Sequence, residues 1–251
     1  MLPSNPSVFR FPDANHLSVV LAQHVHSIAE SAIQKHGRFL VAVSGGSLPS
    51  LLFPHLVQIH SHFAQWHVFL ADERRVPPSH PDSNFLLIQR YLKGLVPSEQ
   101  LYGLDPWDGE GQDVADAYMQ RLMDVFAHKE SVRFPVFDCI LLGMGPDGHT
   151  ASLFPHQEDI LNESINWVVP VEHSPKPPPK RVTLSLPVIN HAHQVFFVVT
   201  GSSKKETIKR VLELHDQHLP ASHISPVHGQ LCWFLDEDAC QNLSPSFIFQ
   251  N

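Results

Sequence analysis

The chain has 251 residues, of which 43% are hydrophobic and 17% charged, a balance typical of a globular protein with a sizeable core. Its 25 acidic and 17 basic residues give a formal charge of −8, which argues against general nucleic-acid binding because that requires a basic face. An anionic substrate would therefore need a local basic pocket. No apolar run approaches the roughly 18 residues that span a membrane, so we expect no membrane association.

The three cysteines are odd in number, and Cys139 lies inside an apolar run, so we expect reduced packing residues rather than disulfides. The first residues lack the basic and apolar regions of a signal peptide. These two observations favour a cytoplasmic protein.

The first elements are a helix, a strand and a loop of small residues. Apolar positions at helical spacing predict an amphipathic helix over residues 14–36. The continuous apolar run 39–43 is typical of a buried parallel strand. It ends at Ser44-Gly45-Gly46-Ser47, and a further helix begins at Leu48. A strand, a small-residue loop and a helix together offer free N–H groups and a positive dipole end to a phosphate. A simple tight turn is the alternative.

A second apolar run, residues 66–71, ends in the charged cluster Asp72-Glu73-Arg74-Arg75. Such a cluster at the carboxyl end of a strand is either a functional edge or a solvated loop. Ser83 or Asn84 is expected to cap a helix over residues 85–92. Residues 94–112 have an irregular pattern, and apolar spacing from Val114 to Phe126 predicts another helix.

The stretch from Asp138 to Pro155 organises the rest of the chain. Its apolar residues predict a buried strand that runs into a turn containing Gly143, Gly145 and Gly148. Asp147 and, two residues later, His149 stand in this turn, where the backbone is most exposed. A strand that ends in a glycine turn and presents His beside Asp is a typical way for an α/β enzyme to place a general base. Residues 150–154 are expected to begin a helix that Pro155 ends.

The same glycines match G-x-G-x-x-G, the dinucleotide-binding pattern. Three features argue against that interpretation. The motif lies past the middle of the chain, Pro146 removes an N–H from the turn, and no second strand ending in an acidic residue follows at the expected distance.

The last part of the chain adds further strands. Strands are predicted at residues 167–171, 182–186, 194–200 and 231–235. The proline-rich segment 174–181 is interpreted as a stiff surface loop, with a polyproline ligand as the alternative. The strand at 194–200 ends at Gly201-Ser-Ser-Lys204-Lys205, a helix with Ile208 and Val211 follows, and Asp236 is expected to cap a short helix.

Strands that alternate with helices predict an α/β fold with a doubly wound, mostly parallel sheet flanked by helices, Rossmann-like, as a single domain over residues 1–251. Right-handed crossovers place the loops that follow the strands at one edge of the sheet, where ligands of such folds bind. The Gly-Gly-Ser loop, the Asp-Glu-Arg cluster, the Asp-Gly-His turn and the Gly-Ser-Ser-Lys loop should therefore meet there.

Two other chemistries are not favoured. The pairs His24-x-His26, His60-x-His62 and His191-x-His193 lack a third ligand at a motif spacing, and 19 histidines produce chance pairs, so no metal site is expected. Ser44 lacks the first glycine of the Gly-x-Ser-x-Gly serine-hydrolase elbow, because Ala42 stands there.

Together these motifs resemble the 6-phosphogluconolactonase family, over roughly residues 39–236. The resemblance rests on Val43-Ser-Gly-Gly-Ser47, Ala71-Asp-Glu-Arg74-Arg-Val-Pro with Asp82-Ser-Asn84, Gly143-Met-Gly-Pro-Asp-Gly-His-Thr-Ala-Ser-Leu-Phe-Pro155, Pro177-Pro-Pro-Lys-Arg-Val-Thr-Leu-Ser-Leu-Pro187 and Leu231-Cys-Trp-Phe-Leu-Asp236.

The resemblance implies hydrolysis of 6-phosphoglucono-δ-lactone to 6-phosphogluconate, a pentose phosphate pathway reaction, without a metal or cofactor. His149 would be the general base, and Asp147 and Asp72 would orient the imidazole or the sugar hydroxyls. Arg74 would stabilise negative charge or position the substrate. The 6-phosphate would rest on the amides of Gly45, Gly46 and Ser47, with Lys204 and Arg181 as counter-charges; Arg181 would face the wrong edge if its strand were parallel, and Lys205 could replace Lys204.

Two alternatives stay open. The related glucosamine-6-phosphate isomerases and deaminases typically carry Ile-Ala-Phe-Asn-Glu-Pro after the histidine, where this chain has Thr150-Ala-Ser-Leu-Phe-Pro155 and no matching glutamate. The other is a non-catalytic sugar-phosphate sensor, for which Asp147 and His149 would be surplus. The sequence indicates neither an oligomeric state nor a protein partner.

Overall fold

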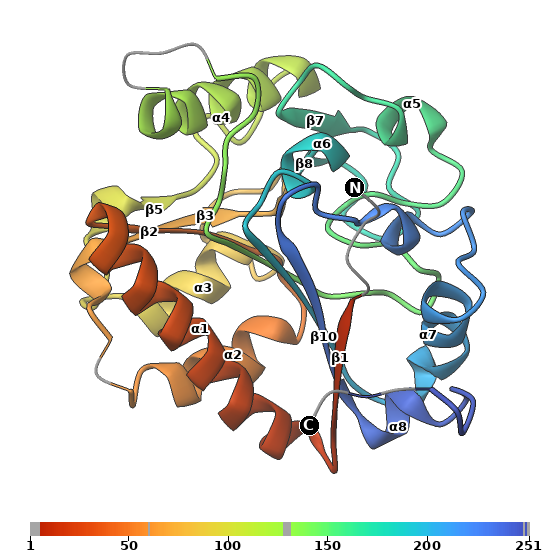
Figure 1. Ribbon diagram of the computed structural model, residues 1–251. Helices are drawn as coiled ribbons and strands as arrows, with labels where there is room; N and C mark the ends of the chain where they lie inside the picture. The colour runs from red at the N-terminus through yellow and green to blue at the C-terminus, as the bar shows by residue number, and fades with distance from the viewer. Residues whose placement is uncertain (1–5, 60, 128–131, 248, 250–251) are drawn as a thin grey trace.

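Seven parallel strands form the central sheet of the computed structural model, which describes residues 6–59, 61–127, 132–247 and 249 (Figure 1). Their order across the sheet is β1 (Ser7–Phe11), β10 (Gln230–Asp236), β9 (Gln194–Val199), β6 (Cys139–Leu142), β2 (Phe39–Val43), β3 (Trp66–Leu70) and β5 (Leu101–Tyr102). Every residue of β2 and β6 is buried, which explains why these strands are continuous apolar runs.

The chain reverses its direction across the sheet between β2 and β6. From β2 it moves outward through β3 to β5, and it then returns to β6 on the other side of β2. Such a switch point opens a crevice at the carboxyl ends of the two strands. The loop that follows β2 contains Gly45 and Gly46, and the loop that follows β6 contains His149. The topology therefore brings the two most distinctive loops of the sequence together.

Helices cover both faces of the sheet, as the sequence predicts. Phe234 of β10 packs against His24 on one face, with ring centroids 5.3 Å apart, and the neighbouring Trp233 faces the opposite side near Val211. Figure 1 shows α1 and α2 on one side of the sheet and α7 and α8 on the other. The helices are α1 (Ala14–His36), α2 (Leu48–Leu56), α3 (Asn84–Leu92), α4 (Gly111–Phe126), α5 (Glu158–Leu161), α6 (Leu186–Ile189), α7 (Lys205–Leu212) and α8 (Glu237–Cys240).

A second, three-stranded antiparallel sheet stands beside the switch point. It consists of β4 (Asp72–Arg74), β8 (Arg181–Leu184) and β7 (Val168–Val171), in that order. The charged cluster after β3 is therefore a short strand rather than a loop. Because β8 runs antiparallel to β4, Arg181 is paired with Arg74 at the same end of the sheet. This pairing removes the concern that Arg181 would face the wrong edge.

Most sequence-predicted elements are confirmed, including the 14–36 helix and the caps at Ser83 and Asp236. Three strands were not predicted: β1, β4 in the charged cluster, and β5 inside the segment expected to be irregular. The helix expected at residues 150–154 is wrong. Ala151 has a φ of 48°, in the left-handed region, and Thr150 pairs with Leu153 in a tight antiparallel bridge. This bridge stops the chain from entering a right-handed helix.

Candidate active site

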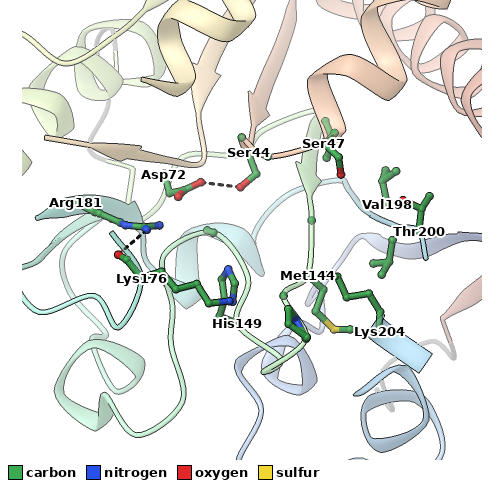
Figure 2. A pocket seen from close by; sticks show the side chains of 18 of the residues that line it. Ser44, Ser47, Asp72, Met144, His149, Lys176, Arg181, Val198, Thr200 and Lys204 are labelled. Atoms are coloured by element: carbon green, nitrogen blue, oxygen red, sulfur yellow. Dashed lines mark hydrogen bonds between the residues drawn. The ribbon is translucent and has the colours of Figure 1, made fainter. Parts of the chain in front are cut away.

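A cavity of about 300 Å³ lies at the carboxyl ends of the parallel strands, beside the β2–β6 switch point (Figure 2). All four loops that the sequence places at one edge contribute to it. Its walls come from residues 44–48, Asp72 and Arg74, residues 143–146 with His149 and Ala151, Lys176 and Arg181, and residues 198–200 with Lys204.

The Gly-Gly-Ser loop requires small residues for two separate reasons. A Cβ on Gly45 would lie 1.9 Å from Oδ1 of Asn84, so only glycine fits there. Gly46 has a φ of 71°, a conformation that glycine adopts without strain. The loop leads directly into α2, whose second residue, Pro49, has no N–H. Residues 45–48, which line the cavity, therefore bring the amides of this helix end to its wall.

Asp72 is a buried carboxylate held by hydroxyl groups. Ser44 Oγ donates to Oδ1 at 2.7 Å, Ser152 Oγ donates to Oδ2 at 2.8 Å, and the residue is only 4% exposed. Its backbone oxygen accepts a 2.8 Å hydrogen bond from Asn84. Asp72 thus ties the loop after β2 to the segment after the His149 turn, and both of its carboxylate oxygens already accept a hydrogen bond.

The turn that carries His149 is shaped by glycines. Gly148 has a φ of 80°, and its N–H donates to the Gly145 oxygen at 3.0 Å. The Gly145 N–H in turn donates to the His149 oxygen at 2.9 Å. A Cβ on Gly145 would lie 2.1 Å from Cε1 and Nδ1 of the imidazole. The missing side chain at Gly145 therefore makes the space in which the ring lies.

The imidazole is fixed through one of its two nitrogens. Nδ1 of His149 is 2.5 Å from Oδ1 of Asp147, and the ring stacks on Phe154 with centroids 4.7 Å apart. An ionised carboxylate opposite Nδ1 favours the tautomer that has its proton on that nitrogen and its lone pair on Nε2. Nε2 makes no hydrogen bond to any residue that the structure describes, and the ring lines the cavity.

Asp147 is ionised by its neighbours. Burial acts to raise its pKa, but the hydrogen bonds and charges of His149 and Lys176 outweigh this and hold the pKa well below its usual range. Lys176 Nζ lies 3.1 Å from Oδ1 of Asp147 and also 3.1 Å from Nδ1 of His149. The three side chains form a compact cluster in which Asp147 accepts from both neighbours.

The two arginines differ in how much of their hydrogen-bonding capacity is used. Arg181 is 3% exposed and donates to the backbone oxygens of Lys176, Pro177 and Pro178 at 3.0 to 3.2 Å. Figure 2 shows its guanidinium turned toward Lys176. Burial, together with the nearby charge of Arg74, lowers the pKa of Arg181. Arg181 therefore holds the proline-rich loop in place, and this loop in turn delivers Lys176.

Arg74 donates to the backbone oxygen of Asp82 at 2.7 Å, and its buried Nε has no acceptor among the described residues. Lys204 lines the cavity, and burial together with Lys176 lowers its pKa. Lys205 instead donates to Gln241 at 3.2 Å, outside the cavity. The geometry thus selects Lys204 over Lys205 as the lysine that faces the cavity.

The cavity is strongly cationic although the whole chain has a charge of −8. Four of its lining residues are cationic, namely Arg74, Lys176, Arg181 and Lys204. Asp72 is the one acidic residue in the described lining. Within the part of the chain that the structure describes, no group of three or more His, Cys, Asp or Glu residues is arranged to hold a metal ion. Over the same residues, no helix is long and apolar enough to cross a membrane.

The structure brings every sequence-predicted site residue to this cavity or into contact with it. Asp147 is the one that does not line the wall, because it stands behind His149. The two aspartates, which the sequence could not distinguish, have different partners: Asp147 contacts the imidazole and Asp72 does not. Sequence reasoning missed Lys176 and the hydroxyl groups of Ser44 and Ser152. The only sequence signal for Lys176 was its place in the proline-rich segment before Arg181.

The fold and the site define an α/β protein with a cationic, histidine-containing cavity at the switch point of its parallel sheet. Residues 12–233 match the model of the family described as glucosamine-6-phosphate isomerases/6-phosphogluconolactonase. The chain therefore belongs to this family.

Individual relatives support the same grouping. The chain is 41% identical to a probable 6-phosphogluconolactonase of Schizosaccharomyces pombe, covering 96% of this chain and 98% of the relative. It is 42% identical to the 6-phosphogluconolactonase of Rattus norvegicus, covering 98% of this chain and 96% of the relative. Among solved structures, the 6-phosphogluconolactonase from Trypanosoma cruzi superposes with a TM-score of 0.85 at 26% identity, covering 97% of this chain and all of that one.

Proposed function

We propose that this protein hydrolyses 6-phosphoglucono-δ-lactone to 6-phosphogluconate, with His149 as the general base. The observation that carries the proposal is the position of His149: its Nδ1 is bound to Asp147, and the ring lines a cavity bordered by four cationic side chains. The similarity to the probable 6-phosphogluconolactonase of Schizosaccharomyces pombe and to the 6-phosphogluconolactonase of Rattus norvegicus supports the choice of substrate.

In the proposed reaction, Nε2 of His149 takes a proton from a water molecule as its oxygen attacks C1 of the lactone. The carbonyl electron pair moves to the carbonyl oxygen and returns as the bond between C1 and the ring oxygen breaks. The imidazolium gives its proton to the departing ring oxygen, which becomes the C5 hydroxyl. The new carboxylic acid then releases a proton to solvent. Water is the only co-reactant, and His149 ends the cycle in its starting state.

Asp147 is proposed to keep the imidazole in the tautomer that has its lone pair on Nε2 and to stabilise the imidazolium. Arg74 is proposed to face the negative charge that develops on the lactone oxygen, because its buried Nε has no protein acceptor among the described residues. A general base contributes about 10²–10⁴-fold to such a reaction. Because a lactone is already an activated ester, positioning of the substrate and one general base are sufficient for catalysis.

The 6-phosphate is proposed to rest on the amides of Gly45, Gly46 and Ser47, with Lys204 as its counter-charge. Figure 2 shows Ser47 and Lys204 on one side of the cavity, with Arg181 and Lys176 on the other. Arg181 is a weaker phosphate ligand, because its guanidinium already donates to the 176–178 loop. We therefore assign Arg181 a supporting role.

A hydrolase fits the site better than the isomerase or deaminase reaction of the same family. Residues 150–155 provide no glutamate beside His149, and Asp72 is the only acidic residue in the described lining of the cavity. Both oxygens of Asp72 accept hydrogen bonds from serines. The described lining therefore offers no second carboxylate placed to move protons on the sugar chain.

The function is tested by comparing two substrates. Freshly generated 6-phosphogluconolactone is given to the protein in a pH-stat, and acid release is corrected for spontaneous hydrolysis. Glucosamine 6-phosphate is assayed in parallel for ammonia release. We expect rapid, saturable hydrolysis of the lactone and no reaction with the amino sugar. Ammonia release without lactone hydrolysis would support the isomerase class, and tight phosphosugar binding without turnover would support a sensor.

A further inference from the structure

A buried carboxylate next to the candidate active site has no part in the reaction proposed above. Glu73 is the middle residue of β4, between Asp72 and Arg74, and it is 2% exposed. Asp72 and Arg74 line the active-site cavity, whereas Glu73 lines a separate cavity that shares no described residue with it. This alternation is the usual one for a strand, whose successive side chains point to opposite faces. Any effect of Glu73 on a substrate in the active site must therefore pass through other residues.

Four donors surround the Glu73 carboxylate. Its Oε1 accepts from the N–H groups of Arg74 and Asn84, at 2.7 and 2.8 Å. Its Oε2 accepts from the Phe85 N–H at 2.8 Å and from the Ser83 hydroxyl at 3.0 Å. Burial raises the pKa of Glu73 to about 7, although these four hydrogen bonds act to lower it. Backbone N–H groups can only donate, so the contacts fit the ionised carboxylate, which holds the start of α3 against β4.

The segment that Glu73 holds contacts two parts of the active site. The Asp82 oxygen accepts a 2.7 Å hydrogen bond from the guanidinium of Arg74. Oδ1 of Asn84 would lie 1.9 Å from a Cβ on Gly45, so this side chain packs directly on the Gly-Gly-Ser loop. Arg74 is thus held at its backbone by Glu73 and at its guanidinium by the loop that Glu73 fixes. The same few residues set the place of the loop that begins at Gly45.

We propose that Glu73 is a positioning residue for lactone hydrolysis, which fixes the guanidinium of Arg74 relative to the Gly-Gly-Ser loop. The inference rests on the proposed function, in which Arg74 faces the charge on the lactone oxygen and the loop takes the 6-phosphate. The two ends of one substrate then depend on the spacing of these two groups. A misplacement of about 1 Å can cost about 10²-fold in rate, so a rigid common anchor serves the reaction directly.

The test is a double-mutant cycle between Glu73→Gln and Arg74→Ala, with kcat for freshly generated 6-phosphogluconolactone as the readout. The glutamine side chain keeps the size of glutamate but turns an NH₂ group toward donors. We expect Glu73→Gln to lower kcat about tenfold or more in the wild-type background, and less than about twofold in the Arg74→Ala background. Equal factors in the two backgrounds would show that Glu73 acts independently of Arg74 and would overturn the proposal. An unchanged kcat in Glu73→Gln would do the same.

Asp138→Asn is the matched control for the loss of a buried carboxylate. Asp138 is 6% exposed and accepts from the Leu40 N–H at 2.8 Å, but it precedes β6, at the edge of the sheet opposite to the cavity. We expect this variant to lower the thermal stability without changing kcat. A fall in kcat equal to that of Glu73→Gln would overturn the proposal. If Glu73→Gln does not fold, Ser83→Ala removes a single donor to Glu73 and enters the same cycle, with an expected fall in kcat of about threefold that disappears in Arg74→Ala.

A spectroscopic readout separates this proposal from the proposed function. The buried Nε–H of Arg74 has no acceptor among the described residues, so its resonance in the ¹⁵N-labelled full chain reports the surroundings of the guanidinium itself. The resonance is assigned through its absence in Arg74→Ala. We expect it to shift or broaden in Glu73→Gln and to stay in place in Asp138→Asn. An unmoved resonance in Glu73→Gln would overturn the proposal, whatever the kinetics. A wild type that shows the expected shift but hydrolyses no lactone would support the positioning of Arg74 and refute the proposed function.

Discussion

The carboxylate of Asp147 lies 2.5 Å from Nδ1 of His149, two residues further along the same glycine turn. A two-residue separation brings the side chains together only because Gly148 takes a φ of 80° and reverses the backbone between them. The pair is thus built by local chain geometry, whereas Lys176, which also contacts it, comes from a distant loop. This relationship leaves Nε2 as the imidazole nitrogen that no described residue binds.

Replacing Asp147 by asparagine should abolish most of the turnover. The amide can donate to Nδ1, which would move the ring proton to Nε2 and remove the lone pair that accepts the proton from water. We expect kcat to fall by about 10²-fold or more, with a much smaller change in KM. Steady-state kinetics with the lactone measure both constants. A fall confined to KM would contradict the orienting role.

The ion pairs of Asp147 should also make stability depend on pH. Burial favours the neutral acid, but His149 and Lys176 outweigh it and lower the pKa in the folded protein below the ordinary value of 3.8. The folded state therefore binds fewer protons than the unfolded state in this range, so the contribution is complete above about pH 4 and is lost as the pH falls further. Urea unfolding of wild type and Asp147→Asn at several pH values measures this contribution to the free energy of unfolding. The stability difference should narrow on going from about pH 7 to about pH 3, and a constant difference would refute the assignment.

Gly145 and Gly143 form a matched pair of positions in the same turn. A Cβ at Gly145 would lie 2.1 Å from the His149 ring, whereas a Cβ at Gly143 would meet nothing within 4 Å. Gly145→Ala should displace the imidazole and lower kcat by about 10²-fold, because small misplacements of a catalytic group are costly. Gly143→Ala should lower kcat less than Gly145→Ala does, because its Cβ leaves the His149 ring in place although Gly143 lines the cavity. Kinetic assays of both variants measure the change in kcat. Thermal unfolding of the same variants shows whether that change comes from a displaced imidazole or from an unfolded protein.

Lys204 and Lys205 provide a second matched pair. Lys204 lines the cavity, while Lys205 reaches Gln241 outside it. Lys204→Met should raise KM about 10- to 100-fold, the value of a charge-assisted hydrogen bond, and weaken the dependence of KM on salt. Lys205→Met should leave both unchanged. Equal increases in KM in the two variants would indicate that the lysines act through the overall electrostatic potential rather than through a direct contact with the phosphate.

The sequence predicts the parallel part of the fold well because each strand is short, apolar and followed by a distinctive loop. Chirality of the crossovers then places those loops at one edge without knowledge of side-chain contacts. It fails for β1, a strand of mixed polarity whose partner β10 lies at the far end of the chain, and for β4, whose three residues are all charged. It also fails for β5, which has only two residues. Such strands are defined by their neighbours rather than by their own pattern.

Within the site, residue types were predictable and partners were not. His149 and the glycine loops were identified from local motifs. Asp147 and Asp72 are distinguished by their contacts, the first with His149 and the second with two serines from different segments, and no local pattern encodes these contacts. Lys176 is placed by Arg181, whose guanidinium binds the oxygens of the proline-rich loop. Sequence patterns cannot predict such an indirect placement, in which one buried side chain positions the loop that carries another.

The most direct test of the account is lactone hydrolysis by His149→Ala, measured in a pH-stat with freshly generated 6-phosphogluconolactone and corrected for the spontaneous reaction. Binding of 6-phosphogluconate by calorimetry serves as the control for an intact cavity. We predict that kcat falls by about 10²–10⁴-fold while product binding is retained. A variant that binds product and still hydrolyses the lactone at the wild-type rate would show that His149 is not the base.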